Sequence, residues 1–111
     1  MTVTAKVLVP PTNVAAAQTT QYTAVNVTAI IDKCTVTNYS ASAASVSLNL
    51  VTSGSSTASS NLLLQNKTLQ PGETYTCPEV VGHVLAAGGY ISAIASVALA
   101  INLRVSGREV T

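Results

Sequence analysis

The stretch SVSLNLVT at residues 45–52 decides the fold class, because apolar and polar residues alternate along it. Its apolar residues would lie on one side of an extended chain, and they are Val46, Leu48 and Leu50. Its polar residues would lie on the other side, and they are Ser45, Ser47 and Asn49. One-sided alternation is typical of an antiparallel sheet with one face in the core and one in water. The stretch therefore predicts a strand whose serine and asparagine side chains face solvent.

The same alternation recurs at residues 99–105. The side chains predicted to face the core there are Leu99, Ile101, Leu103 and Val105, and those predicted to face water are Ala100, Asn102 and Arg104. Less regular strands are expected at residues 2–9, 22–27, 28–38, 73–77 and 90–97. Their predicted inward residues are Ile30, Cys34, Val36, Tyr75, Cys77, Ile91, Ala93 and Ala95. About seven short strands with little helix predict an all-β chain, a small antiparallel β-sandwich of Ig-like or jelly-roll-like type, with an open barrel as the alternative.

Three features between and within the strands complete the predicted fold. The sequence QPGE at residues 70–73 predicts a type II turn with positive φ at Gly72. Residues 78–85 are the one helical candidate, because a proline and a glutamate open the segment, although its three valines limit it to a turn or two. Strict alternation along residues 28–38 would bury Asp32, so we expect a β-bulge or a paired carboxylate there.

The N-terminal residues are predicted to lie apart from the sandwich. Residues 1–20 are interpreted as a strand followed by an extended arm, and residues 21–111 as the β-sandwich domain. Pro10 and Pro11 cannot join a central ladder, and residues 12–20 show no period. We therefore expect the arm to contact other chains, and we expect its removal to leave the sandwich folded.

The composition limits the function classes. Hydrophobic residues make up 48% of the chain and charged residues 8%, against about 25% charged in an average domain. This balance suits either a chain held against a partner or a soluble self-associating one. The net charge is +1 and the five cations are scattered, which argues against nucleic-acid binding. No apolar run is long enough for a membrane helix or a secretion signal, so we expect synthesis in a cytoplasm.

The sequence predicts no catalytic residue, metal site, cofactor or small-molecule substrate. Cys77, Glu79 and His83 have no further ligand nearby for zinc, which needs four ligands or three plus water. No nucleophile elbow or phosphate loop is present. Cys34 and Cys77 share inward parity, so a disulfide is conceivable, but the absence of a secretion signal favours two buried thiols.

Partner contacts are predicted at eight residues, namely Pro10, Pro11, Asn13, Gln18, Tyr22, Arg104, Arg108 and Glu109. The C-terminal sequence SGRE at residues 106–109 has two open interpretations. It is either a solvated tail or the source of an arginine–carboxylate contact with a neighbouring chain.

Several segments resemble a small virion protein of tailed bacteriophages. They are AIIDKCTVTN at residues 29–38, LQPGETY at 69–75, PEVVGHVL at 78–85, and the end of the chain from ISA at 91–93 through LRVSGRE at 103–109. The likeness covers residues 29–111 and leaves the predicted arm unmatched. The pattern Pro-Glu-x-x-Gly-x-x-Leu and the Ser-Gly-Arg-Glu tail are its more particular features, whereas a strand followed by a Pro-Gly turn is common in β-sandwiches.

The resemblance implies a structural protein of the virion, assembled in the host cytoplasm. Its implied role is that of a capsid decoration (cement) protein that stabilises the phage head by binding neighbouring capsid subunits. The implied partners are the major capsid protein or other virion proteins, together with further copies of the chain in a homo-oligomer. The alternatives are a tail or fibre component and a host-surface (glycan) binding β-sandwich module. No catalytic residues come with this family.

Overall fold

The computed structural model describes residues 1–111 and is built almost entirely of strands. The strands are β1 (Val3–Asn13), β2 (Thr19–Thr23), β3 (Thr28–Asn38), β4 (Ala44–Val51), β5 (Leu62–Leu69), β6 (Thr74–Tyr75), β7 (Val84–Leu85), β8 (Tyr90–Ala95) and β9 (Ile101–Val110). The single helical element is η1, a 3-10 turn at Ser59–Asn61. It follows that no helix of this structure is long and apolar enough to cross a membrane.

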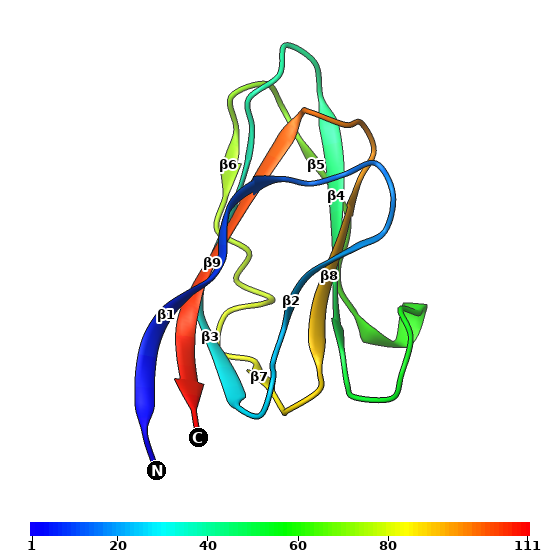
Figure 1. Ribbon diagram of the computed structural model, residues 1–111. Coiled ribbons are helices and arrows are strands. Elements are labelled where there is room, and N and C mark those ends of the chain that lie inside the picture. The colour runs from blue at the N-terminus through cyan, green and yellow to red at the C-terminus, as the bar shows by residue number, and fades with distance from the viewer.

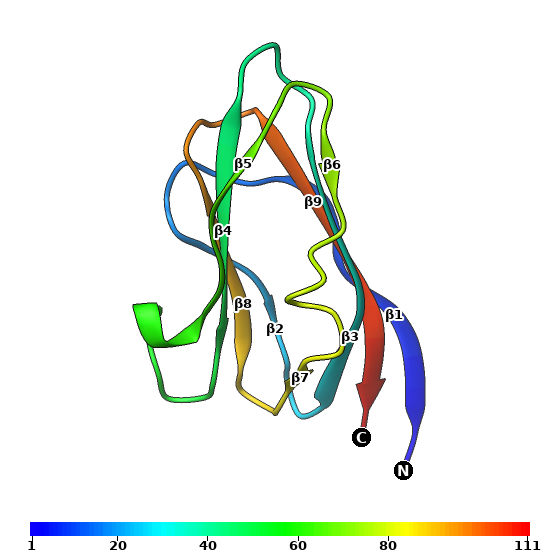
Figure 2. The same cartoon turned by 180° about the vertical axis from the view of Figure 1, so that it is seen from behind.

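The strands form two antiparallel sheets, which confirms the predicted β-sandwich. One sheet has the order β1-β9-β3-β6, and β7 also pairs with β3. The other sheet has the order β2-β8-β4-β5. Figures 1 and 2 show the two layers facing each other, with the ends of β1 and β9 projecting together beyond one end of the pair.

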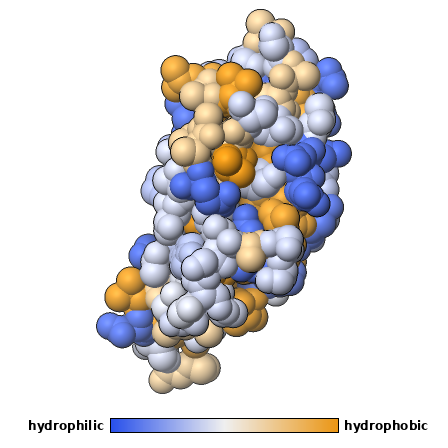
Figure 3. Space-filling view, turned by 90° about the vertical axis from the view of Figure 1, so that its right-hand side faces the viewer, coloured by the Kyte–Doolittle hydropathy of each residue, from blue (hydrophilic) through white to orange (hydrophobic).

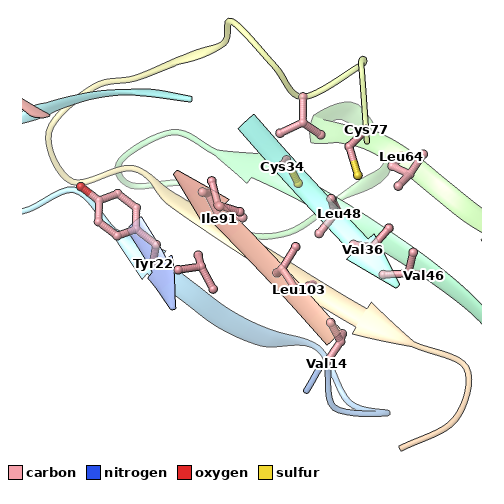
Figure 4. Close-up of a cluster of buried hydrophobic side chains, with 14 of the residues drawn as sticks. Val14, Tyr22, Cys34, Val36, Val46, Leu48, Leu64, Cys77, Ile91 and Leu103 are labelled. Atoms are coloured by element: carbon pink, nitrogen blue, oxygen red, sulfur yellow. The ribbon is translucent and has the colours of Figure 1, made fainter. Parts of the chain in front are cut away.

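The core lies between the sheets and contains 24 buried residues. Leu48, Ile101 and Leu103 are buried as predicted, and so are the small side chains along β8. Leu50 is only partly buried at the edge of this cluster. Figure 4 shows aliphatic side chains from both sheets meeting in this space, with Leu48 and Leu103 among them.

Asp32 lies at a β-bulge and is also paired, so both alternatives predicted for this residue occur together. The register between β3 and β9 shifts between Ile31 and Lys33. Arg108 donates through Nε to Asp32 Oδ2 and through Nη2 to Oδ1, each at 2.9 Å, and this holds the pKa of Asp32 below its ordinary value. Because the bulge changes the alternation, Ile31 faces the core, and the inward prediction for Ile30 is wrong.

The start of β9 differs from the prediction. Leu99 was expected in the core but is 70% exposed, and Ala100 was expected in water but is 2% exposed. The strand begins only at Ile101, after Leu99 adopts the left-handed conformation at φ 57°. Tyr39 N then donates to Ala100 O at 3.0 Å, which holds the chain as it enters the strand. The turn at Leu99 therefore delays the start of the strand to a point two residues later than the sequence suggests.

Residues 78–85 do not form the predicted helix. The segment makes turns and then β7, which pairs with β3 through Val84 and Leu85. Gly82 has φ 89° and its N donates to Ile31 O at 2.7 Å, so the backbone bonds go to β3 instead of to a helical turn. Valine suits an extended chain better than a helix. The Pro-Gly turn is confirmed, with Gly72 at φ 80° and Glu73 N donating to Gln70 O at 2.9 Å.

The predicted N-terminal arm is part of the sandwich, which corrects the interpretation of residues 12–20. β1 pairs with β9 from Val3 to Asn13, and β2 pairs with β8 from Thr19 to Thr23. Val14 between them is fully buried, so the segment crosses from one sheet to the other over the core. Pro10 and Pro11 fall in a register shift of this edge strand, where a missing N–H is tolerated.

Candidate functional site

The structure does not gather the eight predicted contact residues into one site. Pro10, Pro11 and Asn13 are exposed on the edge strand β1. Gln18 lies over the outer face of the four-stranded sheet, and Tyr22 reaches across to Glu109. Arg104 and Arg108 are exposed on β9, and Arg108 binds Asp32 of the same chain. Arg108 thus makes an arginine–carboxylate contact within the chain, and a contact of the C-terminal sequence with a neighbouring chain stays a prediction.

Tyr22 and Glu109 form a polar link between the two sheets. The Tyr22 hydroxyl donates to Glu109 Oε2, and Lys6 Nζ lies 3.3 Å from the same oxygen. The hydrogen bond from Tyr22, helped by Lys6, lowers the pKa of Glu109. Burial and the neighbouring carboxylate raise the pKa of Tyr22. Glu109 is therefore ionised at neutral pH and fixes β2 against β9.

Removal of the Tyr22 hydroxyl should raise the pKa of Glu109. In Tyr22→Phe the carboxylate loses its strongest hydrogen bond, so its pKa should move back toward about 4.3, the ordinary value for glutamate. A carboxylate with a depressed pKa stabilises the fold above its unfolded pKa, and this contribution disappears as the pH falls through the folded pKa. The acid-induced loss of stability should thus be smaller in the variant and be complete at a higher pH, while it begins near the unfolded pKa in both proteins.

The measurement is an NMR titration of the Glu109 side-chain carboxyl carbon. Tyr39→Phe is the matched control, because the Tyr39 hydroxyl donates to Asn13 and not to a carboxylate. An unchanged Glu109 titration in Tyr22→Phe would show that the hydrogen bond does not hold in solution.

The outer face of the five-stranded sheet carries a group of polar side chains that we call the β3–β9 tile. It consists of Lys33, Thr35, Arg104 and Ser106, which line a shallow hollow of about 290 Å³. Lys33 is opposite Ser106 and Thr35 is opposite Arg104 in the pairing of β3 with β9. Only Arg104 was predicted as a contact residue. The other three could be found only from the strand register, because each is unremarkable in the sequence alone.

The outer face of the four-stranded sheet is polar but buried, contrary to the prediction that Ser47 and Asn49 face water. Their exposed fractions are 6% and 3%. Gln18 Nε2 donates to Ser92 Oγ at 2.7 Å, and Asn49 Nδ2 donates to Asn61 Oδ1 at 2.6 Å. These contacts fold the crossing segment and the loop before β5 over the sheet. Figure 3 shows this side of the molecule, where hydrophilic and hydrophobic side chains are mixed.

A hollow of about 240 Å³ remains on this second face. Amide side chains dominate its polar lining, and they are Gln18, Asn49, Gln65 and Asn66. Every buried side-chain nitrogen and oxygen of the protein has a hydrogen-bond partner. The buried amides and hydroxyls of this face therefore hold the crossing segment and the loop before β5 against the sheet by hydrogen bonds.

Cys34 and Cys77 are free thiols, both fully buried. The pairing of β3 with β6 places Val36 opposite Tyr75, and extension of this register by two residues brings Cys77 opposite Cys34. Figure 4 shows both sulfur atoms in the core. The hydrogen bond with Cys77, together with burial, raises the pKa of the Cys34 thiol. The pair packs as small apolar side chains, which is the arrangement that the sequence favoured over a disulfide.

The side chains of Cys77, Glu79 and His83 do not converge. The Tyr75 hydroxyl donates its proton to the Glu79 carboxylate and lies 2.6 and 2.8 Å from the two carboxylate oxygens. His83 is exposed, whereas Cys77 faces the core. No group of three or more histidine, cysteine, aspartate or glutamate side chains in the chain is placed to hold a metal ion.

No protein-family model, curated protein or solved structure matches this chain. The resemblance to a phage virion protein therefore stays a prediction. The support for any function comes from the surfaces described above.

Proposed function

We propose that this chain is a capsid decoration (cement) protein of a tailed bacteriophage, located in the virion, where it stabilises the head by binding neighbouring capsid subunits. The observation that carries the proposal is the free edge of β1. This edge is a surface on which a strand of another subunit can be added.

β1 is eleven residues long and hydrogen-bonds to β9 on one side only. An unpaired strand edge offers its N–H and C=O groups to another chain, which is the basis of β-augmentation. Pro10 and Pro11 lack backbone N–H groups, so the half of the edge nearest the crossing segment is poorly suited to pairing with another strand. The other half projects beyond the sandwich, and its Val3 and Val7 side chains are 52% and 38% exposed. This half suits pairing with a capsid subunit or with a second copy of the chain.

A second apolar surface lies at the opposite end of the domain. Tyr39, Val97 and Leu99 are exposed by half or more on the β3–β4 and β8–β9 connections. The domain is elongated, with extents of 46 × 26 × 19 Å. Contact surfaces at the two ends of such a body suit a protein that joins neighbouring subunits of a lattice. The low content of charged residues agrees with a surface that is covered in use.

The test is to purify particles that carry the chain and to determine its copy number and its position in their density. A decoration protein is present in hundreds of copies over the shell, whereas a handful of copies at one vertex means a tail component. Val3→Asp with Val7→Asp should lower the occupancy on particles and leave the chain folded. Val81→Asp, at another exposed valine, is the matched control. Absence of the chain from particles would overturn the proposal.

The amide-lined hollow supports one other candidate, a tail or fibre module that binds host-surface glycans. Asparagine and glutamine side chains both donate and accept hydrogen bonds, which matches sugar hydroxyls. The hollow contains no aromatic side chain for stacking against a sugar ring, so it is the weaker candidate. Saturable binding of a soluble glycan, lost in Gln65→Ala, together with a low copy number, would favour it over capsid decoration.

A further inference from the structure

The protein has nine charged side chains, and its acidic and basic members differ in how many of them have a partner within the chain. All four carboxylates are engaged within the chain. Asp32 binds Arg108, Glu109 binds Tyr22 and Lys6, Glu79 binds Tyr75, and Glu73 accepts from the backbone N of Gln70. Two of these carboxylates, those of Asp32 and Glu109, are therefore paired with cations, and none of the four binds Lys33 or Arg104.

Two of the five cations have neither a carboxylate nor an aromatic partner. Lys6 and Arg108 form the two salt bridges of the structure, and Lys67 Nζ lies 4.7 Å from the centre of the Tyr75 ring. The remaining two are Lys33 and Arg104, and both belong to the β3–β9 tile. The unpaired positive charge of the chain is thus concentrated in one place.

The geometry of the tile brings these two cations close together. Lys33 is on β3 and Arg104 is on β9, two residues apart in the register, so they are diagonal neighbours on one face. Such neighbours lie about 7–8 Å apart on a sheet. Because both side chains are long, their charged ends can reach the same bound carboxylate. Thr35 and Ser106 fill the other two corners, and their hydroxyls line the same hollow.

Two unpaired cations at this separation repel each other. A bound anion would remove the repulsion and add charge-assisted hydrogen bonds, which are stronger than neutral ones. Arginine offers a planar fork to a carboxylate, while lysine and the two hydroxyls add donors from the other side. We propose that the β3–β9 tile is a binding site for acidic side chains of a protein partner.

A protein partner fits the tile better than a nucleic acid does. Affinity for a phosphate backbone grows with the number of cations that contact it, and the tile offers only two. A short acidic segment needs only a local positive site.

The tile deepens the function proposed above, since it names the chemistry of the capsid partner and rests on the capsid role only for the identity of that partner. The capsid role and the binding of acidic side chains by the tile can be disproved independently. Binding of acidic peptide by a chain that is absent from particles would overturn the capsid role and leave the tile intact.

The test is an NMR titration of the full chain with a capped tetraglutamate peptide at low salt. Saturable shifts are expected at the backbone amides of all four tile residues, and added salt should weaken them. A capped tetraglutamine peptide should give no such shifts. The double variant Lys33→Gln with Arg104→Gln should bind the peptide about tenfold more weakly or not at all.

Lys67→Gln is the control, because it removes one positive charge from a half-buried strand position outside the tile. It should retain the affinity of the unchanged protein, and all variants should retain its melting temperature. Equal weakening by Lys67→Gln would show that binding follows net charge, and it would overturn the proposal. Absence of saturable shifts, or tighter binding of a short oligonucleotide than of the peptide, would overturn it as well.

Discussion

Removal of residues 1–13 should abolish the cooperative unfolding transition of this protein. Leu8 and Val9 on β1 are 4% and 1% exposed, and the strand covers one side of β9 along its length. The loss of two core side chains costs about 2–5 kcal/mol each, while a whole domain is stable by only about 5–15 kcal/mol. Val14 would also lose the strand that holds it in place. Urea unfolding followed by far-UV circular dichroism measures the outcome.

A shorter truncation is the control for this experiment. Residues 1–4 are exposed and add only ladder hydrogen bonds at the projecting end, so their removal should leave a cooperative transition. The difference between the two truncations isolates the part of β1 that begins at Leu8. Cooperative unfolding of the longer truncation would restore the interpretation of residues 1–20 as a separate arm.

Local alternation was enough to predict the sheet architecture and much of the core. Leu48 on β4 and Leu103 on β9 follow a two-residue period, and both lie in the core as expected. Asp32 interrupted the period on β3, and the interruption was the signal for the observed bulge. These features are local, since the preference of each residue is visible from its immediate neighbours.

The errors arose where distant segments determine the environment of a residue. Ser47 and Asn49 have the polar pattern of an exposed face, but Gln18 and the loop before β5 cover them. Residues 78–85 have one apolar side, but their backbone bonds go to β3. Alternation cannot show which segment lies over an outer face, because that depends on the path of the whole chain.

The candidate site was mostly beyond prediction for the same reason. Arg104 was singled out from the sequence, but Lys33, 71 positions earlier, becomes its neighbour only through the pairing of β3 with β9. The bulge at Asp32 also decides which residues share the outer face with Arg104. A one-residue change of register would move Lys33 to the other face and remove the tile.

Leu103→Ala should lower the free energy of unfolding by about 2–5 kcal/mol. Leu103 is fully buried on β9, the strand that lies between β1 and β3 in the five-stranded sheet. It is opposite Val36 on one side and Thr12 on the other, and Figure 4 shows it within the cluster of side chains between the sheets. Paired strands on both sides restrict the collapse of the chain around the lost methyl groups, so a cavity should remain.

Leu99→Ala is the matched control for Leu103→Ala, because it makes the same chemical change four residues earlier on a side chain that is 70% exposed. Its effect should stay within about 0.5 kcal/mol. Urea unfolding should show a lower midpoint for Leu103→Ala with an unchanged slope, which marks a loss of stability without a change in the denatured state. A cost below about 1 kcal/mol for Leu103→Ala, or equal costs for the two variants, would mean that β9 does not present Leu103 to a packed core.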